Sequence, residues 1–171
     1  AVGAFALTAN TSGQYNTAIG SNSLPVNTTG GSNVGVGMDV LKANTTGGSN
    51  VGVGIYGLEA NTDGANNTAI GCDTLKTIVS ANNNTALGKS SGTGLIVGNA
   101  NTFLGATTST ANNVSNSTAI GYGAAITASN QIVVGTSSET TAIKGNTEIA
   151  GTLDVTGDVA VNTDKFTVAA G

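Results

Sequence analysis

The sequence predicts an all-β protein: a repetitive parallel β-roll, or β-solenoid, with 17-residue rungs, assembled as a parallel homotrimer and followed by an interwound trimeric β-shaft. Three observations predict the stacked short strands, and the one-sided strand ribbon near the C-terminal end predicts the assembly of several copies. A short motif that ends in glycine recurs at a fixed spacing, Gly, Thr and Asn number 26, 27 and 21 of the 171 residues, and charged residues fill only 8% of positions. Helices need more charged surface residues and fewer glycines, whereas short strands joined by Gly and Asn turns accommodate this composition.

The repeated motif reads Asn-Thr-Ala-Ile-Gly or a close variant of it. Its closing glycines are Gly3, Gly20, Gly37, Gly54, Gly71, Gly88, Gly105, Gly121 and Gly135. Their successive numbers differ by 17 six times, then by 16, then by 14. A fixed period of this length is typical of solenoids, in which each repeat stacks on its neighbours. We therefore predict a β-roll region over residues 1–138, with rungs about 4.8 Å apart and a height of about 40 Å.

Several columns of identical residues keep this register and are predicted to form structural ladders. Six asparagines open the motif, at Asn16, Asn33, Asn50, Asn67, Asn84 and Asn101. On stacked rungs they would form a ladder of amide hydrogen bonds, and at a fibre axis they could also hold an anion or a water. The glycine ladder consists of Gly20, Gly37, Gly54, Gly71, Gly88 and Gly105. Leucine follows the glycine by four residues, which predicts an apolar column, at Leu7, Leu24, Leu41, Leu58 and Leu75. A further asparagine column lies seven residues after the closing glycine, at Asn10, Asn27, Asn44, Asn61 and Asn112.

The motif alternates along its length, so its strand should have two different faces. Thr or Val and then Ile, Val or Leu share one face, and Asn, a small residue and Gly share the other. We expect the first face to pack apolar side chains and the second to let another backbone approach closely, with Phe103 as the exception. The unit after Gly88 lacks the leucine, which predicts a bulged or reshaped turn near 89–98, with the register resuming at Asn101.

The pattern changes near the C-terminal end. From Ile143 onwards apolar residues alternate with polar ones, as in a strand ribbon that is apolar on one face only. Such a face must be covered by another layer, and three copies around an axis would cover it. We therefore predict that residues 139–171 form an alternating-strand β-prism or triple β-helix shaft segment.

The composition disfavours most chemistry, and we predict no catalytic, cofactor-binding or metal-binding residue. The chain has no histidine, the commonest general base and metal ligand, and one cysteine cannot build a zinc site. We therefore do not expect an enzyme. Five lysines against nine acids offer no patch for nucleic-acid phosphates. No run of 18 apolar residues is present, so membrane insertion is not expected.

Three patterns that mimic sites are interpreted as by-products of the repeat. Cys72 has no histidine to activate it as a nucleophile. The phosphate-loop patterns at 52–57 and 83–90 lack a following helix in the first case and the required leading glycine in the second. Three acids of the C-terminal segment lack the dense oxygen ligands of a calcium loop, at Asp154, Asp158 and Asp164.

Two stretches resemble known fibrous families. The units NTAIGxxxL, and above all STAIGYGAAITASNQIVVGTSS at 117–138, are similar to the head repeats of trimeric autotransporter adhesins and to related repeats of bacteriophage tail fibres. The stretch GTLDVTGDVAVNTDKFTV at 151–168 is similar to repeats of phage tail and neck fibre proteins. The resemblance implies a left-handed parallel β-roll in a tight parallel homotrimer. The usual rung of these families is shorter than the rung of this chain, and only the interval from Gly121 to Gly135 approaches it.

We therefore expect a structural shaft segment of a trimeric phage tail fibre involved in host attachment. Its partners would be itself, other fibre or tail proteins, and a host receptor reached through a tip outside this segment, and its location the extracellular virion. The alternative is the head domain of a bacterial trimeric adhesin at the cell surface, but no heptads follow the repeats. An ice-binding solenoid is disfavoured, because paired threonines such as Thr28 and Thr29 face opposite ways in a strand.

Overall fold

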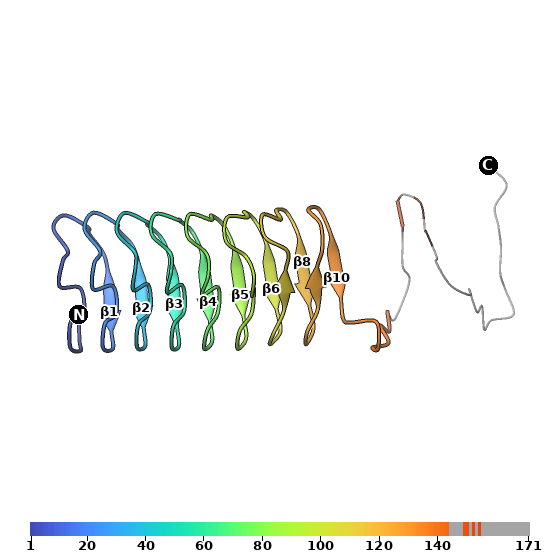
Figure 1. Ribbon diagram of the computed structural model, residues 1–171, viewed down its shortest axis with the longest axis horizontal. Coiled ribbons are helices and arrows are strands. Elements are labelled where there is room, and N and C mark those ends of the chain that lie inside the picture. Colours follow the sequence, from blue (N-terminus) through green and yellow to red (C-terminus); the bar gives the residue numbers. More distant parts are fainter. Residues whose placement is uncertain (144–148, 151, 153, 155–171) are drawn as a thin grey trace, which may run out of the picture. The chain divides into compact units, whose positions relative to one another are not determined.

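The computed structural model describes residues 1–143, 149, 150, 152 and 154. The chain divides into two units, residues 1–141 and 142–171, and the first is a β-solenoid (Figure 1). Its described part contains strands and turns and no helix, which confirms the predicted all-β solenoid with 17-residue rungs. The predicted shaft falls mostly outside the described residues. No helix of the described part is long and apolar enough to cross a membrane.

Eight short strands, one from each rung, form the main sheet in the order β1-β2-β3-β4-β5-β6-β8-β10. All of its pairs are parallel. A second sheet contains only β7 and β9. The strands are β1 (Thr17–Ile19), β2 (Val34–Val36), β3 (Val51–Val53), β4 (Thr68–Ile70), β5 (Thr85–Leu87), β6 (Thr102–Leu104), β7 (Ser109–Thr110), β8 (Thr118–Ile120), β9 (Ala125–Ile126) and β10 (Ile132–Val134).

The register of the main sheet survives the shortening of the last rungs. Thr17 pairs with Val34, Thr102 with Thr118, and Thr118 with Ile132. The step in residue number between paired positions thus falls from 17 to 16 and then to 14. The residues lost from the shorter rungs are therefore taken from the turns and the opposite side of the coil. The eight strands keep one continuous face.

Residues with left-handed backbone recur at fixed columns and turn the chain at the corners of each rung. In the leucine column the φ angles are 52° at Leu24, 51° at Leu41 and 55° at Leu58. This region is costly for L-residues, and here the leucine side chain is completely buried, which offsets the cost. The closing glycine has a φ that other residues rarely adopt, such as 133° at Gly37, and a Cβ there would collide with the carbonyl of Gly54 on the next rung.

The interior of each rung lies between the inner face of the main sheet and the leucine column. The small central residue of the strand points inward and is buried, as Ala18 and Ala69 show. The larger first and third residues point outward. The expected packing of the larger face is therefore wrong for the single chain, because the rung is too narrow for two large side chains. Where the central residue is Gly52, a Cβ would collide with Val40, which already fills that space.

The irregular rung keeps its core by exchanging one large residue for another. Gly92 stands where the other rungs have leucine, and its φ is 74°. Phe103 replaces the small central residue of the next strand and is 1% exposed. A Cβ at Gly92 would lie 2.5 Å from Leu75 Cδ2 and 3.2 Å from Phe103 Cδ2. The ring therefore occupies the space of the missing leucine, and the turn predicted near 89–98 is reshaped around it.

Candidate functional site

The asparagine column of the motif forms the main side-chain ladder of the interior. Each Oδ1 accepts a hydrogen bond from the backbone N–H of the ladder residue on the next rung, at 2.9 Å from Asn33 to Asn16 and 3.0 Å from Asn50 to Asn33. Each Nδ2 donates to a carbonyl of the next rung, as from Asn33 to Gly47 at 2.8 Å. At the end, Asn101 Oδ1 accepts from the Ser117 N–H at 3.1 Å. The amides hold neighbouring rungs together, and each of their oxygens and nitrogens has a partner among the described residues.

A second asparagine ladder runs through the first rungs and stops abruptly. Asn44 Nδ2 donates to Asn27 Oδ1, and Asn61 Nδ2 to Asn44 Oδ1, each at 2.8 Å. Ile78 takes this place on the next rung, and Asn61 Oδ1 is left buried without a donor among the described residues. The sequence pattern also put Asn112 in this column, but Asn112 is exposed. Its rung has lost a residue. Val114 on this rung is buried, but its carbonyl accepts from Asn101 Nδ2 as the Gly64 carbonyl accepts from Asn50 Nδ2, so it belongs to another column.

A threonine column lies next to the second asparagine ladder, since Thr28, Thr45 and Thr62 directly follow its residues, and its hydroxyls bond between rungs. Thr28 Oγ1 donates to the Thr45 carbonyl at 3.0 Å, and Thr45 Oγ1 to the Thr62 carbonyl at 3.1 Å. Thr62 Oγ1 bonds in the same way to the Val79 carbonyl at 3.2 Å. These hydroxyls are engaged within the rod and do not form a free array.

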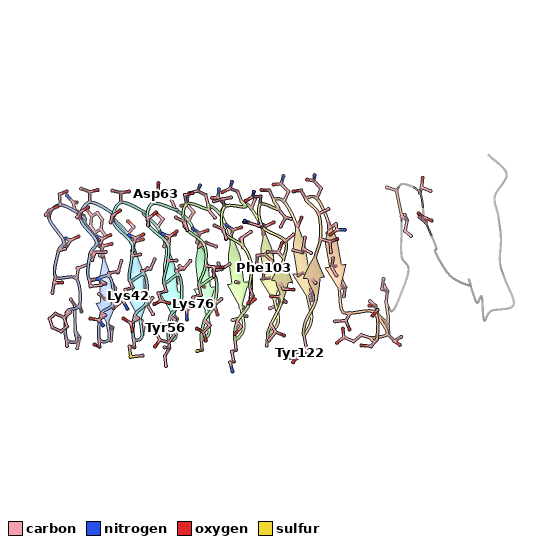
Figure 2. The ribbon with its side chains drawn as sticks, in the orientation of Figure 1. Lys42, Tyr56, Asp63, Lys76, Phe103 and Tyr122 are labelled. Atoms are coloured by element: carbon pink, nitrogen blue, oxygen red, sulfur yellow. The ribbon has the colours of Figure 1, made fainter. Side chains whose placement is uncertain are left out.

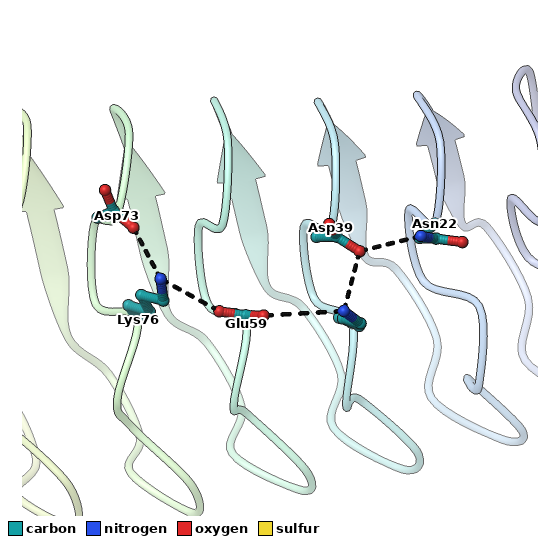
Figure 3. Close-up of polar contacts among 6 residues, drawn as sticks. Asn22, Asp39, Glu59, Asp73 and Lys76 are labelled. Atoms are coloured by element: carbon teal, nitrogen blue, oxygen red, sulfur yellow. Dashed lines mark hydrogen bonds and ion pairs between the residues drawn. The ribbon is translucent and has the colours of Figure 1, made fainter.

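Charged side chains gather along one corner of the rungs that carry Asp39, Glu59 and Asp73, and we call this group the ion-pair chain (Figure 3). Lys42 Nζ lies 3.2 Å from Asp39 and 3.9 Å from Glu59, and Lys76 Nζ lies 3.5 Å from Glu59 and 3.0 Å from Asp73. Each lysine thus bridges acids of two rungs. Both lysine side chains are more than 40% exposed, so each pair contributes less than about 1 kcal/mol.

Two further contacts extend the ion-pair chain. Asn22 Nδ2 donates to Asp39 Oδ1 at 3.1 Å, and Lys76 Nζ lies 4.3 Å from the centre of the Tyr56 ring. Figure 2 shows Lys42, Tyr56 and Lys76 together at one edge of the coil and Asp63 at the opposite edge. Sequence reasoning missed this group, although Lys42, Glu59 and Lys76 themselves repeat at the 17-residue period.

The cysteine and the acidic residues that the sequence analysis considered can be placed in part. The pKa of Cys72 is raised, chiefly because its thiol hydrogen-bonds to the Asp73 carboxylate at 3.2 Å. A raised pKa lowers the thiolate fraction and with it the reactivity of the sulfur. The described residues contain no group of three His, Cys, Asp or Glu that could hold a metal ion. The pattern at 52–57 begins in β3 and leads into another turn. Of the three C-terminal acids only Asp154 is described.

The outward residues of the main sheet form a surface of different character, which we call the outer sheet face. It consists of the first and third residues of β1–β6, β8 and β10. Its aliphatic row is 37–49% exposed at Ile19, Ile70, Leu87, Leu104, Ile120 and Val134. None of these strands contains a charged residue. The face is therefore an uncharged strip that runs the length of the solenoid.

Comparison of this chain with protein-family models, with curated proteins and with solved structures finds no match.

Proposed function

We propose that this chain is a structural shaft segment of a trimeric phage tail fibre, which takes part in host attachment by holding a receptor-binding tip away from the virion. The observation that carries the proposal is the unbroken rung-to-rung bonding of the solenoid. Backbone, asparagine and threonine hydrogen bonds join the rungs, such as Val34 N–H to the Asn50 carbonyl at 2.8 Å. These bonds lie along the stacking axis, so they oppose extension and bending of the rod.

The interior supports a spacer role more than a binding role. Its buried polar residues bond to the neighbouring rung, and its apolar residues fill the space between sheet and leucine column. The largest ionisable group of the described residues, the ion-pair chain, consists of lysines neutralised by nearby carboxylates. We propose a non-enzymatic role on this basis.

The outer sheet face supports assembly with further copies of the chain. The face is uncharged and carries an exposed aliphatic row, and the alternation from Ile143 onwards also calls for a covering layer. We therefore propose a homotrimer that joins other fibre or tail proteins in the extracellular virion. A bacterial adhesin head is the second candidate, favoured by the 14-residue last rung, whose strand β10 still pairs in register with β8.

Sedimentation of the purified 171-residue chain tests the assembly. We expect a trimer that keeps its β-sheet circular dichroism and resists protease. A folded monomer across the accessible concentration range contradicts the homotrimer. Antibodies raised against the chain then separate the two candidates: labelling of virion fibres supports the tail fibre, and labelling of bacterial surfaces supports the adhesin.

A further inference from the structure

We propose that the outer sheet face is the contact surface between copies of this chain, that equivalent rungs lie at the same height, and that the strands β2 and β3 set this register. The inference rests on the proposed homotrimer and specifies which surface forms it. The occupant of the face is thus two further parallel copies of the same chain.

The first argument is the contrast between this face and the rest of the solenoid. The ion-pair chain occupies a corner outside the main sheet. The hydroxyls of the threonine column donate to carbonyls of neighbouring rungs, at Thr28, Thr45 and Thr62. The outer sheet face has neither charges nor cross-rung side-chain hydrogen bonds among the described residues. Depletion of charge with exposed aliphatic side chains is typical of the centre of a protein interface.

The second argument is periodicity and size. The outer sheet face repeats at every rung, so a partner can contact it in the same way along its whole length only if the partner has the same rung spacing. A parallel copy of the chain has this spacing. Eight strands of three residues present on the order of 350 Å² in projection. Three such faces around an axis would bury on the order of 1,000 Å² in all, or on the order of 350 Å² between each pair of copies.

The third argument concerns the threonine hydroxyls of the face. Five of its strands begin with a threonine whose hydroxyl makes no hydrogen bond within the described residues, at Thr17, Thr68, Thr85, Thr102 and Thr118. Burying an unpaired hydroxyl costs about 1–3 kcal/mol. A hydroxyl is both donor and acceptor, so threonines of different copies at the same height satisfy one another around the axis.

The Val-Gly-Val strands β2 and β3 make this match depend on the register. At equal heights each threonine meets threonine, and Val34 and Val51 meet valine. A shift of one rung would place Thr17 against Val34 and Thr68 against Val51 and would leave buried hydroxyls without partners. Val34 and Val51 therefore distinguish the correct register from a shifted one on a surface that otherwise repeats.

Cysteine cross-linking of the full chain tests the inference. In a Cys72→Ser background we expect Thr85→Cys, and independently Thr102→Cys, to form inter-chain disulfides, because a disulfide needs Cα atoms within about 7 Å. The matched control is Thr46→Cys, since Thr46 is exposed on the turn opposite the ion-pair chain and its side chain makes no hydrogen bond among the described residues. We expect no disulfide there.

The outcomes separate this inference from the proposed function. A trimer by sedimentation with no disulfide at position 85 or 102 overturns the inference and leaves the trimeric fibre standing, whereas a folded monomer overturns both. Co-expression of Thr68→Cys and Thr85→Cys chains tests the register: we expect each to link to its own kind. A predominance of mixed 68–85 disulfides would show a one-rung offset and refute the role of β2 and β3.

Discussion

A single asparagine side chain explains why this residue recurs at one place in six rungs. Asn50 Oδ1 accepts from the backbone N–H of Asn67 at 3.0 Å and from its Nδ2 at 3.2 Å, while Asn50 Nδ2 donates to the Gly64 carbonyl at 2.7 Å. Aspartate would lose the donor, and leucine would lose both functions. The sequence predicted this ladder because the spacing and the residue type both recur. The sequence did not indicate that the second ladder ends at Asn61. The ladder ends there because the side chain of Ile78, on the next rung, has no N–H group to donate to Asn61 Oδ1.

Replacing Asn50 by alanine should destabilise the solenoid measurably. The change leaves the buried Asn67 N–H without an acceptor, which costs about 2 kcal/mol. Chemical denaturation followed by circular dichroism measures the loss. Asn112→Ala is the matched control, because Asn112 is exposed and its amide makes no hydrogen bond among the described residues. Equal losses in the two variants would contradict the ladder's role.

The Asp73 carboxyl makes part of the stability depend on pH. Its pKa is lowered, chiefly by the hydrogen bond from Lys76 and then by that from Cys72. A lowered folded pKa contributes stability above the unfolded value, and this contribution is lost as the pH falls through the folded pKa. The melting temperature of the wild type should therefore exceed that of Asp73→Asn at neutral pH, and the gap should close as the pH falls below about 4. A gap that stays constant down to strongly acidic pH speaks against this pairing.

At the scale of the strand, alternation predicted two faces but did not show which face lies inside. The answer depends on the width of the closed rung, which leaves room for Ala69 opposite a leucine but not for Ile70. That width comes from the left-handed corners, and residues as different as Asp39, Tyr56 and Leu58 adopt them. The corner column that holds Asp39 and Tyr56 has no residue type in common, so its position was not predictable. The positions of the strands and of the leucine column were predictable, since both follow from the 17-residue spacing alone.

The exchange between Gly92 and Phe103 can be tested as a double-mutant cycle. Phe103→Ala removes the ring that fills the irregular rung and should cost about 3–5 kcal/mol. Gly92→Leu should also destabilise the wild type, because its side chain would collide with Leu75 and Phe103. Together the two changes recreate the arrangement of the regular rungs, so the double variant should be more stable than Phe103→Ala alone. Additive losses in denaturation midpoints would show that the two residues do not share one space.

At the scale of the whole molecule, folding and the proposed assembly would use different surfaces. The solenoid closes its own core, formed by residues such as Leu24, Leu41 and Ile78 that are completely buried within one chain. The leucine column therefore supplies the core of this unit within the single chain. In the proposed homotrimer, further copies would cover only the outer sheet face. A variant that blocks assembly should therefore leave the solenoid folded.

Two aspartate substitutions separate these surfaces. Leu58 is completely buried, and Leu58→Asp places an unpaired charge in the core, so we expect loss of β-sheet circular dichroism and aggregation. Leu87 lies on the outer sheet face and is 45% exposed in the single chain, so Leu87→Asp should keep the circular dichroism of the solenoid. Its three charges would meet around the axis and repel one another, and sedimentation should show a folded monomer. A Leu87→Asp chain that stays trimeric would place the contact between copies on another face of the rod.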